Sequence, residues 1–325
     1  TTMARFVIED TTAPDAPTMI CPNDTTIYLD ANCAVDTTSG TLGLASSSAS
    51  DVCDSNPTLD EYYSDSELVY TCTGDDTDLQ GSYSFTRTFY AAATDACDLT
   101  GDTSNCAQII TVLDTLSPVL TAALDETVEC DGSGNTAELA AWLADNGGAT
   151  GTDNCDSELS WTNNYDASNF ADSCGATGTV SVTFTAADDC NNMSTTTATF
   201  IIEDTTDPTI TVEAENDTVE CDGAGNAAAL AAWLADNGGA EATDACSGPV
   251  IWSNDHVALS DLCGATGESE VTFTATDSCG NASTTMARFV IEDTTAPDAP
   301  TIICPNDTTI YLDANCAVDT TSGAL

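Results

Sequence analysis

The sequence has no lysine, only three arginines (Arg5, Arg87 and Arg288) and one histidine, set against 54 aspartates and glutamates. Its formal net charge is therefore −51. Nucleic acids and anionic lipid surfaces carry the same sign of charge, so we expect neither nucleic-acid binding nor membrane binding. The absence of lysine also excludes the Lys–Asn isopeptide crosslinks that stiffen many adhesin modules.

Catalytic motifs and long apolar runs are also absent. The sequence contains no GxSxG, no HExxH and no glycine-rich phosphate loop. The single histidine, His256, has no recurring partner elsewhere in the chain, and we expect it on the surface or in a loop. No run of 18 apolar residues exists, so no membrane-spanning segment and no membrane insertion are predicted. We therefore predict that the chain is not an enzyme.

Cysteine is abundant instead. Sixteen cysteines occur in 325 residues, 42% of which are hydrophobic, so the chain can fold despite its charge. No pair has the CxxC spacing of a zinc or redox site, which favours disulfides over metal thiolates. Disulfides persist in oxidising compartments, so we expect an extracellular location, at the cell surface.

Internal repeats organise the chain. Residues 1–40 recur at 284–323 with a single difference, Met19 against Ile302, which defines a period of 283 residues. Three smaller units lie inside this period, each opening with a proline-bearing linker after an apolar strand. We predict the last strand of a preceding module (1–9), a first repeat (10–113), a second repeat (114–203), a third repeat (204–292) and the start of another module (293–325).

The residue pattern within each repeat predicts strands. Residues 179–190 and 270–279 alternate Thr or Ser with Val and Phe, the period of a half-buried strand, and a short turn leads to a closing strand. Residues 135–146 and 226–237 differ, because Ala and Leu dominate there. We expect a three-turn helix in each, with Asn as N-cap and a tryptophan (Trp142, Trp233) pointing inward. The expected fold class is all-β, with tandem β-sandwich modules, two of which carry a short inserted helix.

Strand direction predicts how the cysteines pair. The closing hairpin puts Cys190 at the end where the repeat begins, the near end, and the helix returns the chain there at Cys155. Cys130 and Cys174 then lie at the opposite, far end. We expect cysteines at the same end of a repeat to bond to each other, and aligning the other repeats extends this pairing to them. The seven predicted bridges are Cys155–Cys190, Cys130–Cys174, Cys246–Cys279, Cys221–Cys263, Cys33–Cys72, Cys53–Cys97 and an additional Cys21–Cys106. Cys304 and Cys316 have no expected partner within this segment.

The same strand directions gather aspartates at each near end. They are the linker Asp, the Asp of a mid-repeat Asp-x-Cys motif and the Asp before the last cysteine. Hard cations bind several carboxylate and carbonyl oxygens, so the triplets are candidate Ca²⁺ ligands. The alternative is a solvated acidic surface with counterions, since no EF-hand spacing is present. The triplets are Asp10, Asp51 and Asp95; Asp114, Asp153 and Asp188; and Asp204, Asp244 and Asp277.

Several motifs together carry a family resemblance. ICPNDTTIYLD (20–30), the mid-repeat Asp-x-Cys, the TDSCGN hairpin (276–281) and FVIEDTTAP (289–297) resemble hyalin repeats. The TVECDG–helix–DNGG variant resembles repeats of giant Bacteroidota surface proteins, including the gliding-motility adhesin. The resemblance implies immunoglobulin-like sandwiches with an adhesive or scaffold role. The inserted helix departs from the hyalin pattern, so one sandwich strand is expected to be replaced.

Recurring Asp-Thr tripeptides resemble the Bacteroidota O-glycosylation consensus. The resemblance implies a glycoprotein with five acceptor threonines: Thr11, Thr25, Thr115, Thr205 and Thr218.

These observations favour a structural function. We expect a repeat region of a bacterial surface filament or adhesin stalk, an acidic rod stapled by disulfides, whose partners are neighbouring modules or further copies of itself. A glycan or other cell-surface ligand would be bound at a tip outside this segment. The rival hypothesis is a carbohydrate- or protein-binding module whose repeats act by avidity.

Overall fold

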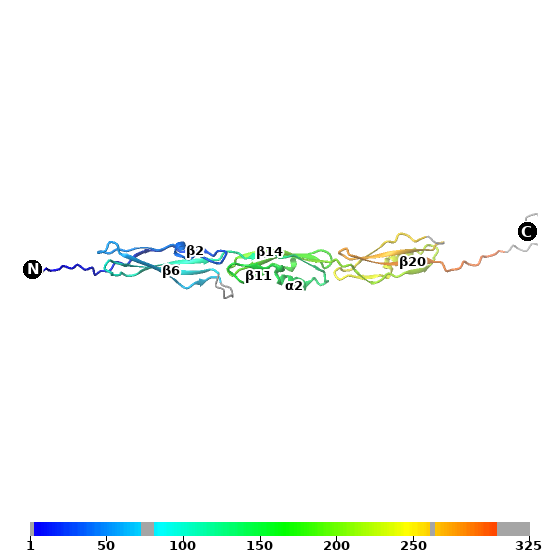
Figure 1. Cartoon of the computed structure of the whole chain (residues 1–325). Coiled ribbons are helices and arrows are strands. Elements are labelled where there is room, and N and C mark those ends of the chain that lie inside the picture. The colour runs from blue at the N-terminus through cyan, green and yellow to red at the C-terminus, as the bar shows by residue number, and fades with distance from the viewer. Residues whose placement is uncertain (1–2, 73–80, 261–263, 304–325) are drawn as a thin grey trace, which may run out of the picture. The chain divides into compact units, whose positions relative to one another are not determined.

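The computed structural model describes residues 3–72, 81–260 and 264–303, and β-strands dominate it (Figure 1). The all-β fold class with tandem β-sandwich modules, predicted from the sequence, is confirmed. Within the described residues, no helix is long and apolar enough to cross a bilayer. Cys263, Cys304 and Cys316 lie outside the described residues.

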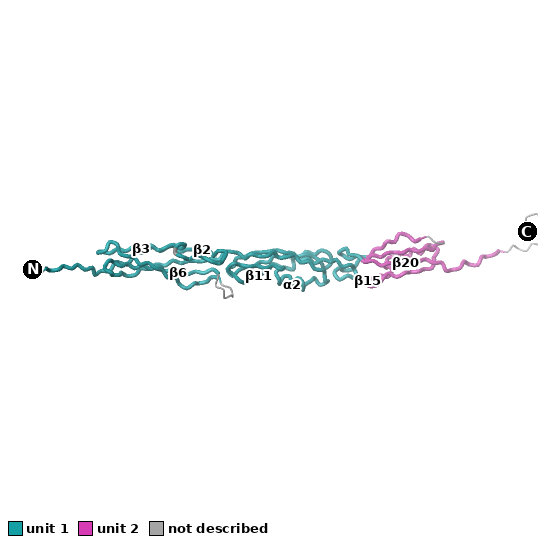
Figure 2. Tube along the Cα trace, in the orientation of Figure 1, with its two compact units in different colours: residues 1–209, 243–251, 276–282 teal, residues 210–242, 252–275, 283–325 magenta. Residues whose placement is uncertain are grey.

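The chain divides into two compact units, coloured separately in Figure 2. Unit 1 comprises residues 1–209, 243–251 and 276–282, and unit 2 comprises residues 210–242, 252–275 and 283–325. Unit 1 therefore contains the first and second repeats together with three short segments of the third, residues 204–209, 243–251 and 276–282.

The first repeat is built on a sheet with the order β2-β7-β6-β4, to which β5 adds along β6. A separate two-stranded sheet pairs β1 with β3. The elements are β1 (Thr18–Ile20), β2 (Thr25–Tyr28), α1 (Ser39–Leu42), β3 (Ser46–Ser48), β4 (Thr58–Asp65), β5 (Val69–Tyr70), β6 (Tyr83–Thr94) and β7 (Ser104–Leu113).

The second repeat has a sheet of order β11-β13-β14-β9, with β12 added along β13, and a small sheet of β10 and β8. The elements are β8 (Val119–Leu120), β9 (Glu126–Glu129), α2 (Thr136–Ala144), η1 (Asn146–Gly148), β10 (Gly151–Thr152), β11 (Ser160–Asn163), η2 (Ala167–Asn169), β12 (Ala171–Asp172), β13 (Gly178–Ala187) and β14 (Met193–Glu203).

Most of the third repeat lies in unit 2 and follows the second repeat closely, with a sheet of order β16-β20-β19-β18 and a small sheet of β15 and β17. The elements are β15 (Thr209–Val212), β16 (Asp217–Glu220), α3 (Ala227–Ala235), η3 (Asn237–Gly239), β17 (Glu241–Thr243), β18 (Ile251–Asn254), β19 (Gly267–Thr276) and β20 (Ala282–Glu292).

Each core forms where alternate residues of the long strands turn to one face. In the second repeat Val180, Val182 and Phe184 of β13 are buried, while the threonines and serine between them are more exposed. The inserted helix covers this face. The ring of Trp142 in α2 packs against the ring of Phe184, with 5.2 Å between the two ring centroids. The Trp142 indole N–H donates to the Leu124 carbonyl at 3.1 Å, so its polar atom is satisfied.

The two helices lie where the sequence predicts, but their N-termini differ from the expectation. Asn135 occupies the N-cap position with a left-handed backbone (φ 48°) and makes no side-chain cap. Its amide instead donates to the Glu129 carbonyl at 2.9 Å, which ties the helix start to the end of β9. Asn226 does the same in the third repeat, donating to the Glu220 carbonyl at 2.8 Å.

The first strand of each main sheet pairs in parallel with the last. β9 pairs with β14 so that Glu129 lies opposite Glu203, and β2 and β16 pair likewise with β7 and β20. The first and last strands of a main sheet therefore both run from the near end of the repeat to its far end.

Candidate functional site

Most of the disulfides join one repeat to the next. The structure contains Cys21–Cys106, as expected, but the other four bridges differ from the prediction. They link the far end of one repeat to near-end cysteines of the following repeat. They are Cys33–Cys155, Cys72–Cys190, Cys130–Cys246 and Cys174–Cys279, with Cα–Cα distances of 5.0, 4.9, 5.9 and 5.2 Å.

Apart from Cys21–Cys106, the predicted intra-repeat bridges between described cysteines are therefore wrong. Cys53, Cys97 and Cys221 are free thiols among the described residues. The strand directions were right, since the Cys130 N–H donates to Glu203 at the end of β14, which places Cys130 at the far end. The cysteines at one end of a repeat bond to the neighbouring repeat and not to each other. The bridges that do not form are Cys33–Cys72, Cys53–Cys97, Cys130–Cys174, Cys155–Cys190 and Cys246–Cys279, whereas the predicted Cys221–Cys263 includes a residue outside the described part of the chain.

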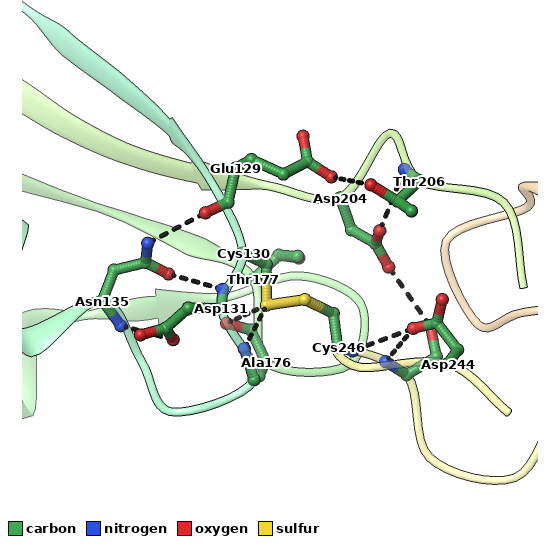
Figure 3. Close-up of a disulfide and its surroundings, with 12 residues drawn as sticks. Glu129, Cys130, Asp131, Asn135, Ala176, Thr177, Asp204, Thr206, Asp244 and Cys246 are labelled. Atoms are coloured by element: carbon green, nitrogen blue, oxygen red, sulfur yellow. Dashed lines mark hydrogen bonds between the residues drawn. A yellow bond between two sulfur atoms is a disulfide. The ribbon is translucent and has the colours of Figure 1, made fainter. Parts of the chain in front are cut away.

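The contact around Cys130–Cys246 lies within unit 1 and is shown in Figure 3. The Ala176 N–H donates to the Cys246 carbonyl at 2.9 Å, so a backbone hydrogen bond accompanies the disulfide. Gly132 has φ +74°, and a Cβ there would collide with the Ala245 carbonyl oxygen. A glycine at this position therefore allows the two backbones to approach closely.

A glutamate fixes the linker that leaves the second repeat. The two carboxylate oxygens of Glu129 accept the Thr205 backbone N–H and hydroxyl, both at 2.9 Å, and the Thr206 hydroxyl at 2.8 Å. These hydrogen bonds, the backbone one from Thr205 first, hold the pKa of Glu129 below its ordinary value. Glu220 accepts the same three bonds from Thr294 and Thr295 in unit 2. The prediction missed these glutamates, although the TVEC motif common to both repeats was the available signal.

The near-end aspartates come together, fully in one case and partly in two. Ligand oxygens of Asp204, Asp244 and Asp277 all lie within 4.8 Å of one another, as the prediction requires. In the other clusters two aspartates join a cysteine sulfur within that distance, and Asp95 and Asp188 are outside it. These clusters are Asp10, Asp51 and Cys53, and Asp114, Asp153 and Cys155. Because Cys155 is in a disulfide, its sulfur is a poor ligand for a hard cation.

The electrostatics of these clusters is unfavourable without a counter-charge. Burial raises the pKa of Asp204 above its ordinary value, and the charges of Asp244 and Asp277 raise it further. Burial likewise raises the pKa of Asp114, with Asp153 and Asp188 contributing. The three oxygens of the Asp204 cluster suit a cation such as Ca²⁺, which would remove this repulsion.

The third aspartate of each triplet has a second role, in shaping the turn before the last strand. One oxygen of Asp277 accepts the N–H groups of Cys279, Gly280 and Asn281, and the other accepts the Asn281 amide at 2.9 Å. Although burial opposes it, these bonds hold the pKa of Asp277 below its ordinary value. In the first repeat Leu99 takes the place of Asn281, and Asp95 Oδ2 is buried with no hydrogen-bond partner in the described structure.

The five predicted glycosylation sites differ in their surroundings. Thr11, Thr115 and Thr218 are exposed, whereas Thr25 is half-buried and donates its hydroxyl to the Asn23 carbonyl. The Thr205 hydroxyl is engaged by Glu129. His256 is only partly buried, as expected for a loop residue, and its Nδ1 lies 3.0 Å from the Ser269 hydroxyl.

An aromatic groove occurs in the first repeat, on β4 and β6. It has a volume of about 370 Å³ and includes Tyr62 and Tyr90, whose rings stack with centroids 4.9 Å apart. Tyr63 lies in the same groove and covers the guanidinium of Arg87 at 4.2 Å. Arg87 is buried and forms a bidentate pair with Asp65 at 2.7 and 2.8 Å.

Comparison with known proteins gives distant structural similarity only. No family model matches the chain, and no curated protein matches it. The solved structures it resembles include EC1-4 of Drosophila N-cadherin, with 11% identity over 88% of this chain and 77% of that chain (TM-score 0.27). EC21-23 of human CDH23 is 14% identical over 86% of this chain and 100% of that chain (TM-score 0.28). EC22-24 of mouse cadherin-23 is 12% identical over 86% of this chain and 99% of that chain (TM-score 0.28). At this similarity no site residue can be transferred.

Proposed function

We propose that this chain is a structural repeat region of an extracellular surface filament or adhesin stalk, in which disulfides staple each repeat to the next. The paired bridges at each junction carry the proposal. Two bridges join the first repeat to the second, and two more join the second to the third. Two covalent links at one junction limit both bending and twisting, which a stalk needs and a catalyst does not.

The chemistry of the chain supports an extracellular site of action. Disulfides are maintained in oxidising compartments, and five are present in the described residues. The charge of −51 keeps neighbouring copies apart and in solution. The proposal includes a bacterial surface protein with hyalin-like repeats, and the sequence motifs alone support this part of it.

Calcium binding at the junctions is part of the proposal. The Asp204 cluster supplies three carboxylates within 4.8 Å, and Asp204 is partly desolvated. A bound cation would link the linker Asp, the mid-repeat Asp and the last-turn Asp, which come from three separate segments of unit 1.

Stiffness at the junctions tests the stalk proposal. Bending between repeats would be measured by electron microscopy or single-molecule imaging before and after reduction with a phosphine. We expect the distribution of bend angles to widen on reduction while circular dichroism still reports folded sheets. An unchanged distribution, in folded protein whose bridges are shown to be reduced, would contradict the stapled-stalk function.

The rival function, ligand binding by avidity, is favoured by one observation. The aromatic groove at Tyr62 and Tyr90 offers a stacked pair of rings of the kind that binds sugar faces. A glycan array read with the wild type and with Tyr62→Ala distinguishes the two functions. Glycan binding that depends on Tyr62 would support the rival, and no binding above background would leave the stalk as the function.

A further inference from the structure

The free thiols occupy the same places as cysteines that are bonded in the sibling repeats. Cys53 aligns with Cys155 and Cys246, which bond to the preceding repeat, and Cys97 aligns with Cys190 and Cys279. Cys221 aligns with Cys33 and Cys130, which bond to the following repeat. Free thiols are therefore found at the near end of the first repeat and at the far end of the third.

The near end of the first repeat has the backbone of a bonded near end. Asp51 Oδ1 accepts the N–H groups of Cys53 and Asp54 at 2.7 and 2.8 Å. Asp244 holds Cys246 and Ser247 in the same way at 2.8 and 2.7 Å. The residue after Cys97, Asp98, has a positive φ of 61°, as Asn191 and Gly280 have after Cys190 and Cys279. Both thiols are exposed, and the Cys97 thiol is among the groups that raise the pKa of Cys53, so the two lie close together.

The turn at Cys221 likewise has the conformation of the bonded turn at Cys130. The Cys221 N–H donates to the Glu292 carbonyl at 2.7 Å, and the Cys130 N–H donates to Glu203 at 2.8 Å. The N–H of the glycine two residues later contacts the sulfur at 3.4 Å in both turns. Forming a bridge at Cys221 therefore requires no rearrangement of the backbone.

The surface beside Cys221 is shaped to receive another near end. Gly132 and Gly175 of the second repeat have positive φ and lie against the Ala245 and Cys246 carbonyls. Their counterparts Gly223 and Gly264 keep the same backbone, with φ +73° and +68°. No described atom lies within 4 Å of a Cβ built at either position, so this surface is open.

From these observations we infer that Cys221 forms a disulfide with Cys53 of the adjacent copy of the 283-residue period. In a chain of successive periods the spacing fits. Cys221 lies 168 residues after Cys53, so the next Cys53 follows Cys221 by 115 residues. The equivalent bridge Cys130–Cys246 spans 116 residues. The inference rests on the proposed stalk function. It continues the inter-repeat disulfides from one 283-residue period to the next, and the bonding partner is a second copy of this sequence.

The chemistry of the bond requires an oxidant. The two thiols lose two protons and two electrons, a small-molecule disulfide such as oxidised glutathione accepts them, and two reduced thiols leave through a mixed-disulfide intermediate.

Disulfide mapping of protein isolated from its source, without reduction, tests the inference. Free thiols are blocked with N-ethylmaleimide at acidic pH, and the chain is cleaved at acidic residues because it has no lysine. We expect a peptide containing Cys221 joined to one containing Cys53. Bonding of Cys53 to Cys97, or alkylation of both Cys53 and Cys221, would overturn the inference. Cys130–Cys246 in the same digest reports on the staples of the proposed function separately.

A second measurement uses the 325-residue chain in a glutathione redox buffer and asks whether separate chains can be joined. We expect non-reducing electrophoresis to show multiples of 33.4 kDa containing the Cys221–Cys53 peptide. Cys221→Ser removes that peptide, whereas Cys304→Ser with Cys316→Ser, the matched control, retains it. Multimers that persist unchanged in Cys221→Ser, with no such peptide in the wild type, would contradict the assignment. The Cys221–Cys53 peptide only in source protein would identify the next period of one chain as the partner.

Discussion

Glu129 holds Thr205 through both of its carboxylate oxygens, one on the backbone N–H and the other on the hydroxyl. Glu129 ends β9, whereas Thr205 follows β14, so the pair joins the entrance strand of the second repeat to its exit linker. The linker thus leaves the sheet in one direction, and the cysteines beyond it are presented to their partners.

Replacing Glu129 with Gln should free this linker. Gln keeps one acceptor oxygen but places an NH₂ group against the donors of Thr205, so we expect faster hydrogen exchange at the Thr205 amide. Glu126→Gln, an exposed position on the same strand, is the control. Unchanged exchange in Glu129→Gln would show that the contact does not fix the linker.

The same contact has a defined pH dependence. Because the pKa of Glu129 is lowered in the folded state, its contribution is present above the ordinary Glu pKa of about 4.3 and is lost as the pH falls through the folded value. Protection of the Thr205 amide should therefore persist at pH 5 and disappear in stronger acid. Loss of protection above pH 5 would contradict this.

Glycan occupancy should differ between two of the predicted acceptors. A sugar on the Thr205 oxygen removes the proton that it donates to Glu129, whereas Thr218 is exposed on β16. In glycosylated protein we expect glycopeptide mass spectrometry to find lower occupancy at Thr205 than at Thr218. Equal occupancy would mean that the modification precedes folding.

Gly132→Ala should destabilise the junction more than Gly223→Ala. Both positions have a left-handed φ, which costs an L-residue about 1–2 kcal/mol. Only Gly132 lies against Ala245, and relieving that collision should add roughly 1–3 kcal/mol. Chemical denaturation of both variants of the 325-residue chain measures the difference, and equal destabilisation would remove the close approach as its cause.

Removing one inter-repeat bridge should lower stability markedly. The double variant Cys174→Ser with Cys279→Ser opens a bridge that spans 105 residues, and we expect a loss of about 2–4 kcal/mol in the free energy of unfolding. The intra-repeat pair Cys21→Ser with Cys106→Ser is the comparison, and it should leave bending at the junctions unchanged. A Cys130–Cys174 bridge mapped in the wild type would refute the assignment.

Removing the charge of Asp204 should raise the melting temperature relative to the wild type when calcium is absent and lower it when calcium is present. Since the folded pKa of Asp204 is raised, its favourable contribution is present below about pH 4 and is lost as the pH rises through the folded value. In EDTA at pH 7, Asp204→Asn should therefore melt at a higher temperature than the wild type, and the difference should vanish near pH 4.

Added calcium should reverse that order. Binding to the folded state raises the melting temperature by mass action, and we expect this only where Asp204, Asp244 and Asp277 are intact. Asp172→Asn, at an exposed aspartate of β12, should respond as the wild type does. A melting temperature insensitive to millimolar calcium would eliminate the cation site.

Much of the fold could be predicted because it is encoded locally. The alternation in β13 and β19 sets strands and core faces, and the Ala-rich segments around Trp142 and Trp233 form the helices. Strand direction alone placed the aspartates of the third triplet at one end, where the structure brings them together.

The disulfide partners could not be predicted in this way, because an even number of cysteines in each repeat suits pairing within a repeat and pairing between repeats equally well. The signal lay in glycines such as Gly132 and Gly175, whose close contacts with Ala245 and Cys246 exist only when another repeat approaches. The hydrogen bonding of Asp95 could not be predicted either. Leu99 stands where the third repeat has an asparagine, so Asp95 Oδ2 has no described partner although the Asp before the last cysteine is retained.

The parallel pairing of entrance and exit strands determines how a repeat would respond to tension. A pull on the chain at both ends of the second repeat draws β9 and β14 past each other lengthwise, so the hydrogen bonds from Glu126 to Glu129 are strained together rather than opened one after another. Once those bonds yielded, the bridge at Cys130 would transmit the pull directly to Cys246 and bypass the rest of the sheet. We therefore expect only a short extension before covalent bonds resist, a mechanical limit that reduction would abolish.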